Sequence, residues 1–80
     1  MAEETAERVR KVIAAILKVP LERVVPQAHL IRDLGMESIQ SIELMAALEE
    51  EFNTDIDADK VGDVLTVGKS IAYMQKTVGG

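Results

Sequence analysis

The sequence has no cysteine and no tryptophan, and it contains one phenylalanine, one tyrosine and one histidine. Without cysteine, the fold cannot depend on disulfide bonds or on thiolate-bound zinc. No apolar run is long enough to cross a bilayer, and the acidic start MAEETAERVRK is unlike a signal peptide. We therefore expect a cytoplasmic protein that does not insert into membranes.

Aromatic side chains are scarce, yet hydrophobic residues make up 48% of the 80-residue chain. The core must therefore be built from aliphatic side chains and methionine, which suits small packed helices. A chain of this length is near the lower limit for one self-sufficient core. We expect a single domain over residues 1–80, and a monomer.

Basic residues are nearly absent from the middle of the chain. Residues 33–63 contain ten acidic residues and one basic residue, Lys60, whereas the segments on either side are net positive. An acidic surface repels phosphates, which disfavours nucleic-acid binding, and it attracts basic protein surfaces. We therefore expect protein partners and no nucleic acid.

The spacing of apolar residues predicts helices and no strands. Residues 5–19 form one amphipathic helix that Pro20 ends, and residues 66–77 form another that Thr66 caps. Two further helices are predicted, over 38–52 and, briefly, over 58–62. The fold class is therefore all-α, an irregular four-helix bundle of three main helices and one short helix. A long first loop, with one helical turn at 21–24, is pinned by Leu30, Ile31 and Leu34.

The predicted helix 38–52 has two apolar faces at 100° per residue. One face is expected to pack on the core, and it consists of Leu44, Met45, Leu48 and Phe52. The other lies among three glutamates, and it consists of Ile39, Ile42 and Ala46 with Glu43, Glu49 and Glu50 around them. Because one stripe is enough to bury a helix, the second predicts a docking surface for a partner. Burial of both faces in a small bundle, or two isoleucines on an ordinary surface, are the alternatives.

Ser38 stands at the start of this helix, and three roles are open to it. A nucleophile needs a base, but the single histidine, His29, has no evident orienting partner, and no G-x-S-x-G elbow is present. An N-cap is the simplest role, and with Ser41 three positions later it makes no capping box. The third role is modification, because a helix N-terminus favours a phosphoester.

The segment DLGMESI at residues 33–39, followed by LEEEF at 48–52, resembles the acyl carrier protein family. The hallmark of that family is D-L-G-x-D-S-L before a helix rich in glutamate and leucine. The likeness extends over residues 5–76. It implies a non-catalytic carrier in which Ser38 bears 4′-phosphopantetheine, transferred from coenzyme A by a phosphopantetheinyl transferase. The thiol of that arm would hold acyl groups as thioesters.

The resemblance also implies partners in fatty-acid, polyketide or a related specialised pathway. They would be acyl-loading enzymes, synthases or acyltransferases with basic patches. The residues expected to dock them are Glu37, Ile39, Ile42, Glu43, Ala46, Glu49 and Glu50. The aliphatic core is expected to open and sheath an acyl chain between the helices.

Three departures from the family pattern concern this surface. Glu37-Ser38-Ile39 replaces Asp-Ser-Leu, Gln40 stands at a position that is usually acidic in fatty-acid carriers, and Ala46 replaces a larger side chain. Together they reduce both charge and apolar area where partners bind. The resemblance therefore favours a specialised carrier over a housekeeping one.

Other interpretations remain beside the carrier: an unmodified acidic helical interaction module, or a peptidyl or aminoacyl carrier. Asp55, Asp57 and Asp59 have the spacing of the first ligands of an EF-hand. However, Lys60 stands where that loop needs glycine and Thr66 where it needs glutamate. We predict no specific metal site, only weak binding of divalent cations by the acidic cluster. We interpret Gly79-Gly80 as a frayed tail.

Overall fold

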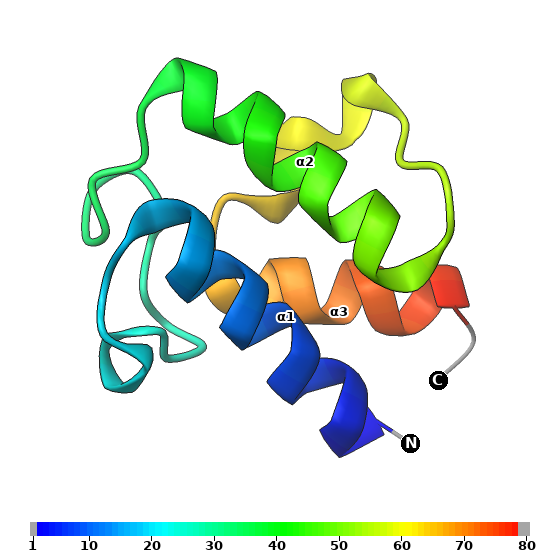
Figure 1. The fold of residues 1–80 in the computed structure, drawn as a ribbon, viewed down its shortest axis with the longest axis horizontal. Helices are drawn as coiled ribbons and strands as arrows, with labels where there is room; N and C mark the ends of the chain where they lie inside the picture. The colour runs from blue at the N-terminus through cyan, green and yellow to red at the C-terminus, as the bar shows by residue number, and fades with distance from the viewer. Residues whose placement is uncertain (1, 79–80) are drawn as a thin grey trace.

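The computed structural model describes residues 2–78, leaving aside the side chains of Ala2, Glu3, Ala58, Val61 and Asp63. The Gly79-Gly80 tail lies outside the described residues. Three α-helices, α1 (Ala2–Leu17), α2 (Ser38–Phe52) and α3 (Val67–Val78), surround a common core (Figure 1). Two 3-10 segments, η1 (Leu21–Arg23) and η2 (Ala58–Val64), lie in the connections. Over residues 2–78 there is no strand, and the predicted all-helical class is confirmed.

The predicted fourth helix at 58–62 is a 3-10 segment instead, so the count of four α-helices is not confirmed. Its first turn is closed between Lys60 N–H and Asp57 C=O at 2.9 Å, and the Asp57 carboxylate accepts from Asp59 N–H at 3.1 Å. Bonds three residues apart make the tighter 3-10 geometry, which is used in short pieces. Gly62 within the segment lowers its preference for an α-helix.

Helix α1 starts and stops earlier than the predicted range 5–19. It begins at Ala2, since the glutamates that follow are good helix formers and are favourable near the positive end of the helix dipole. It ends at Leu17 because Lys18 has a left-handed φ of 57°, which lets Val19 N–H donate to Ala14 C=O at 3.2 Å. This closure and the Pro20 that follows prevent another α-helical turn.

The core is aliphatic, as the composition predicts. Helix α1 contributes Val9 and Ile13, which are both fully buried, and α2 contributes Leu44 and Leu48. Met74 of α3 is also fully buried, whereas Phe52 and Tyr73 are only partly buried against the cluster. Among the residues that the structure describes, no helix is both long and apolar enough to cross a membrane.

The long first loop is fixed by more contacts than its predicted anchors provide. Leu30 and Leu34 are buried as predicted, but Ile31 is 48% exposed, so its assignment as an anchor was wrong. Arg10 of α1 holds the loop through its backbone, because its guanidinium donates to the carbonyls of Val24 at 2.8 Å and Leu21 at 3.1 Å. These bonds link α1 to the connection that leads toward α2.

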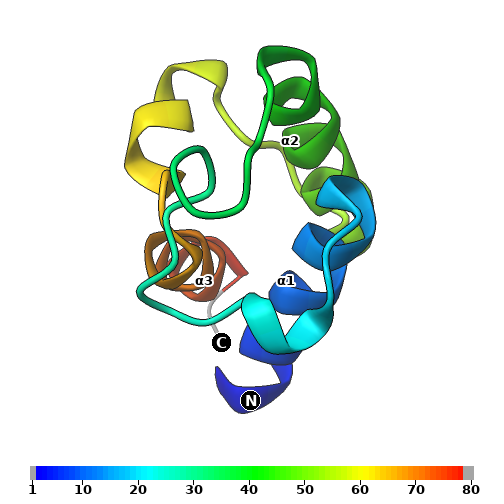
Figure 2. The same cartoon turned by 90° about the vertical axis from the view of Figure 1, so that its left-hand side faces the viewer.

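The same loop pairs with the junction between η2 and α3. Leu30 N–H donates to Leu65 C=O at 2.8 Å, and Val67 N–H donates to Ala28 C=O at 3.0 Å. Gly68 lies so close to this loop that a Cβ atom there would be 3.0 Å from the Pro26 carbonyl oxygen. Figure 2 shows the loop crossing one end of the three helices. The segment before α2 is thereby held by both α1 and α3.

Candidate functional site

Ser38 is the first residue of α2, and it is exposed. The N-cap role that was open to Ser38 belongs to Glu37 instead, which has the extended N-cap conformation, with φ −92° and ψ 164°. Gln40 is therefore the third helical residue, and its Oε1 accepts from Glu37 N–H at 2.9 Å. This is the glutamine arm of a capping box, which we had not expected. The hydroxyl of Ser38 therefore does not cap the helix.

The backbone at Ser38 is held from the helix side as well. The hydroxyl of Ser41 donates to the Ser38 carbonyl oxygen at 2.6 Å. Within residues 2–78, the Ser38 hydroxyl itself has no hydrogen-bond partner. The residue thus combines a fixed backbone with a side chain that is available for chemistry.

The turn before α2 fixes the direction from which the chain reaches Ser38. Gly35 has a left-handed φ of 71°, a conformation that glycine adopts without steric cost. Met36 N–H donates to Leu30 C=O at 2.9 Å, and the Met36 side chain is buried in the core. Met36 therefore anchors the chain two residues before Ser38, a role that the sequence alone had not revealed.

His29, the only histidine, is part of this turn and not of a catalytic pair. Its Nδ1 accepts from the N–H groups of Ile31 and Arg32 at 3.2 and 3.1 Å. The backbone N–H of His29 donates to the Asp33 carboxylate at 2.7 Å. The ring nitrogen that accepts these bonds stabilises the loop, so its role is structural.

An open hollow of about 290 Å³ lies beside Ser38. The loop, α2 and the residue after η2 all contribute to its lining, which comprises Ile31, Met36, Glu37, Ser38, Ser41 and Leu65. Three of these side chains are aliphatic or thioether groups and two carry hydroxyls. The sixth lining residue is Glu37, so the wall beside Ser38 is half apolar and half polar.

The outer face of α2 remains open to solvent next to this hollow. Ile39 is 60% exposed and Ile42 is 67% exposed, and Ala46 is also exposed. Glu43 and Glu50 are exposed on the same helix. Within the described residues, the bundle does not bury both apolar faces of α2. An apolar surface with acidic neighbours is therefore present next to Ser38.

Two of the glutamates predicted for docking, Glu49 and Glu37, also have structural roles that the sequence did not show. Glu49 is only partly exposed, and its Oε2 accepts from Ile56 N–H at 2.7 Å. This bond holds the connection from α2 to η2, so one of its two carboxylate oxygens is already used. Glu37 is exposed and forms the N-cap of the helix that begins with Ser38.

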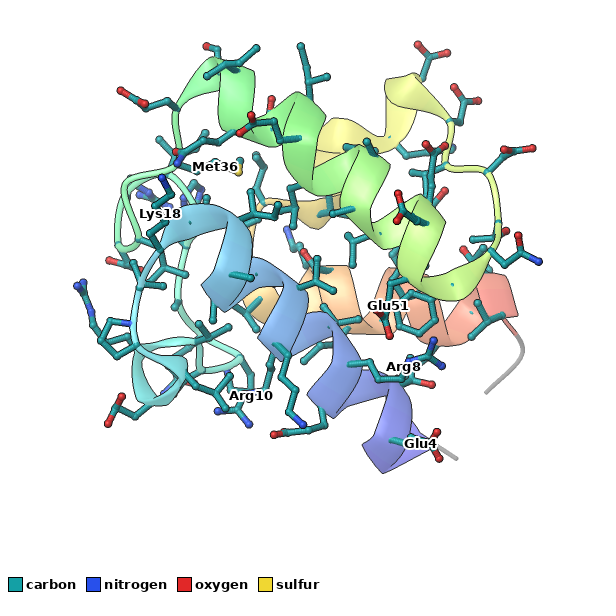
Figure 3. All side chains as sticks on the ribbon, in the orientation of Figure 1. Glu4, Arg8, Arg10, Lys18, Met36 and Glu51 are labelled. Atoms are coloured by element: carbon teal, nitrogen blue, oxygen red, sulfur yellow. The ribbon has the colours of Figure 1, made fainter. Side chains whose placement is uncertain are left out.

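The far end of α2 is electrostatically different from the end that carries Ser38. Arg8 of α1 forms an ion pair with Glu51 at 2.8 Å and lies 4.4 Å from the centre of the Phe52 ring. Figure 3 shows Arg8 and Glu51 together between α1 and the last turn of α2, well away from Met36. The positive charge of Arg8 thus neutralises Glu51 at the C-terminal end of α2.

The acidic segment after α2 does not form a metal site in the part of the chain that the structure describes. No group of three acidic or histidine side chains there is arranged to hold an ion, so Asp55, Asp57 and Asp59 do not converge. The Asp57 carboxylate instead accepts from Asp59 N–H. The EF-hand spacing therefore reflects a capped 3-10 turn.

The sequence profile of the phosphopantetheine attachment site family matches residues 7–74. The chain belongs to this family. Its cofactor is accordingly 4′-phosphopantetheine, covalently attached. Domains of this family are carriers that act together with partner enzymes and are not catalytic themselves. The resemblance to acyl carrier proteins is confirmed at the level of a phosphopantetheine-bearing carrier domain.

Proposed function

We propose that this protein carries acyl intermediates as thioesters on a 4′-phosphopantetheine arm attached to Ser38. The proposal rests on the exposure of the Ser38 hydroxyl and on its lack of hydrogen bonds. It is exposed at the first turn of a 15-residue helix and free of hydrogen bonds within the described residues. The N-terminus of a helix is also favourable for the negative phosphodiester that attachment creates.

The residues around Ser38 fit such an arm. The hollow of about 290 Å³ offers apolar side chains from Ile31, Met36 and Leu65 beside the attachment point. The arm supplies a thiol on which acyl groups are held, a group that the chain itself lacks because it has no cysteine. The absence of cysteine is compatible with a reducing compartment such as the cytoplasm.

Attachment transfers the phosphopantetheinyl group from coenzyme A to the Oγ atom of Ser38. A phosphopantetheinyl transferase removes the proton of the Ser38 hydroxyl, and Oγ forms a bond to the phosphorus atom that bears the pantetheine group. The pyrophosphate bond of coenzyme A breaks, and 3′,5′-ADP leaves with the electron pair. The protein's own part is to present Oγ, and the Ser41 hydroxyl bond to the Ser38 carbonyl supports that presentation.

We further propose that partner enzymes dock on the outer face of α2. The partners are the transferase and acyl-loading enzymes, synthases or acyltransferases whose basic patches complement Glu37, Glu43 and Glu50. Ile39, Ile42 and Ala46 provide apolar contact area. Glu49 lies at the margin of this face, where Oε1 remains for a partner because Oε2 accepts from Ile56 N–H. In this proposal the carrier is a monomer, and its cargo belongs to a fatty-acid, polyketide or related specialised pathway.

Intact mass measurement after incubation with coenzyme A and a phosphopantetheinyl transferase tests the attachment site. The unmodified protein should gain one phosphopantetheinyl group, and Ser38→Ala should gain none. Ser41→Ala, which leaves Ser38 in place, should still gain it. Because Ser38 is an exposed residue and not the N-cap, its substitution should change the free energy of unfolding by no more than about 0.5 kcal/mol. A mass gain that persists in Ser38→Ala would refute the assignment.

A further inference from the structure

The side chain of Gln40 joins the beginning of α2 to the end of α1. Its Oε1 accepts from Glu37 N–H at 2.9 Å, and its Nε2 donates to the Ile16 carbonyl oxygen at 3.5 Å. The second bond is long, and the side chain that makes it is partly buried between the two helices. One amide group therefore has a partner at each of two helix ends.

Both partners are backbone groups that a helix cannot satisfy by itself. Ile16 is the next-to-last residue of α1. Its carbonyl is one of the last four of the helix, and no N–H group within the helix donates to these four. Glu37 is the N-cap of α2 and lies immediately before Ser38. The two ends are thus tied at the residue next to the attachment point.

An amide side chain can make both bonds because it carries an acceptor oxygen and a donor nitrogen. A carboxylate would accept from Glu37 N–H equally well, but it has no proton to donate to the Ile16 carbonyl. A methionine has a similar length and makes neither bond well. The resemblance to fatty-acid carriers implies an acidic residue at this position, and glutamine in its place has a structural consequence: it adds a connection to α1.

We propose that Gln40 is a positioning residue for the loading of Ser38. By holding the first turn of α2 against the end of α1, it fixes where the Ser38 hydroxyl lies relative to the body of the protein. The inference rests on the proposed function, in which Ser38 is the attachment residue. Loading requires Oγ to meet the phosphorus atom in a defined geometry, so loosening this turn slows the chemical step more than the encounter.

Two substitutions distinguish the bond to the Ile16 carbonyl from the bond that caps α2 at Glu37. Gln40→Glu keeps the acceptor for Glu37 N–H and loses the donor for Ile16, while Gln40→Met loses both. Gln27→Glu, at an exposed loop position, is the matched control because it adds the same charge away from α2. Loading by the transferase is followed by intact mass at several concentrations of the carrier, which gives kcat and KM separately. Hydrogen exchange at Glu37 N–H reports the cap.

If Gln40 positions Ser38, Gln40→Met should lower kcat about fivefold with little change in KM, the factor that corresponds to the loss of about one side-chain hydrogen bond. Gln40→Glu should also lower kcat, although Glu37 N–H stays protected from exchange. Gln27→Glu should leave kcat unchanged. If Gln40 were only a cap, Gln40→Glu would match the unmodified protein, and that result would overturn the proposal.

The same experiment distinguishes the two proposals from each other. Failure of the unmodified protein to gain a group on Ser38 would refute the proposed function. Normal loading of the unmodified protein together with an unchanged kcat in Gln40→Glu would refute the positioning role alone. If Gln40→Met does not fold, Gln40→Glu decides the question, because its cap is retained.

Discussion

The two apolar faces of α2 are built from the same kinds of residues, but they have opposite environments. Leu44 and Leu48 are 2% and 1% exposed, whereas Ile39 and Ile42 are 60% and 67% exposed. The difference arises because α1 and η2 pack around the helix on one side and leave the other uncovered. Hydrophobic side chains on one helix can therefore contribute to the fold or be available to a partner, and burial distinguishes the two.

Two adjacent glutamates at the end of α2 repeat the contrast on a smaller scale. Glu49 accepts from Ile56 N–H and holds the connection to η2, while Glu50 is exposed. Their sequence context, LEEEF, gives no means of telling them apart. In the structure Glu49 stabilises the fold, whereas Glu50 is accessible to solvent.

The largest expected effect is a difference in stability between substitutions on the two apolar faces of α2. Leu48→Ala should lower the free energy of unfolding by about 2–5 kcal/mol, because it removes buried methyl groups and leaves a cavity. Ile42→Ala should change it by less than about 0.5 kcal/mol, because the side chain is mostly in water already. Urea denaturation measures both. Similar losses would indicate that the outer face of α2 is covered in solution.

A smaller effect should separate the two glutamates. Glu49→Ala should lower the free energy of unfolding by about 1–2 kcal/mol, since the partly buried N–H of Ile56 loses a charged acceptor. Glu50→Ala should change it by less than about 0.5 kcal/mol. The same denaturation experiment applies. Equal stabilities of the two variants would mean that water replaces the Glu49 carboxylate without cost.

The smallest effect concerns the encounter with partners. Glu43→Lys and Glu50→Lys should each slow loading by the transferase about three- to tenfold, mainly through association, because a docking charge is reversed. Glu22→Lys, exposed on η1, is the control with the same change in net charge. Loading of the unmodified protein should also slow as salt rises, since exposed charges are screened. An equal effect from Glu22→Lys would show that net charge acts without a specific face.

Local signals in the sequence predicted the elements that depend on neighbouring residues. The range 38–52 coincides with α2, and Thr66 caps α3, its Oγ1 accepting from Lys69 N–H at 3.1 Å. Both follow from helical periodicity and from a hydroxyl placed before an apolar stripe. The cap of α2 lies one residue before Ser38, at Glu37, although serine is the more frequent N-cap.

The second apolar face of α2 was predicted from an angular projection, and the structure leaves Ile39 and Ile42 in solvent as that projection requires. Ile31 was assigned to the core by hydrophobicity alone, and it lies instead beside the hollow next to Ser38. In an irregular loop no periodicity tells which side chain faces inward. The prediction failed where the backbone has no repeat.

The sequence by itself determined the aliphatic core, the helical class and the motif that contains Ser38, because composition, periodicity and spacing are written along the chain. Only the tertiary structure decided that Arg10 holds the loop, that Glu49 holds Ile56 and that Gln40 connects α1 with α2. Each of these contacts joins residues between 7 and 24 positions apart. A side chain's partner at that distance depends on how the helices pack, and neighbouring residues do not encode it.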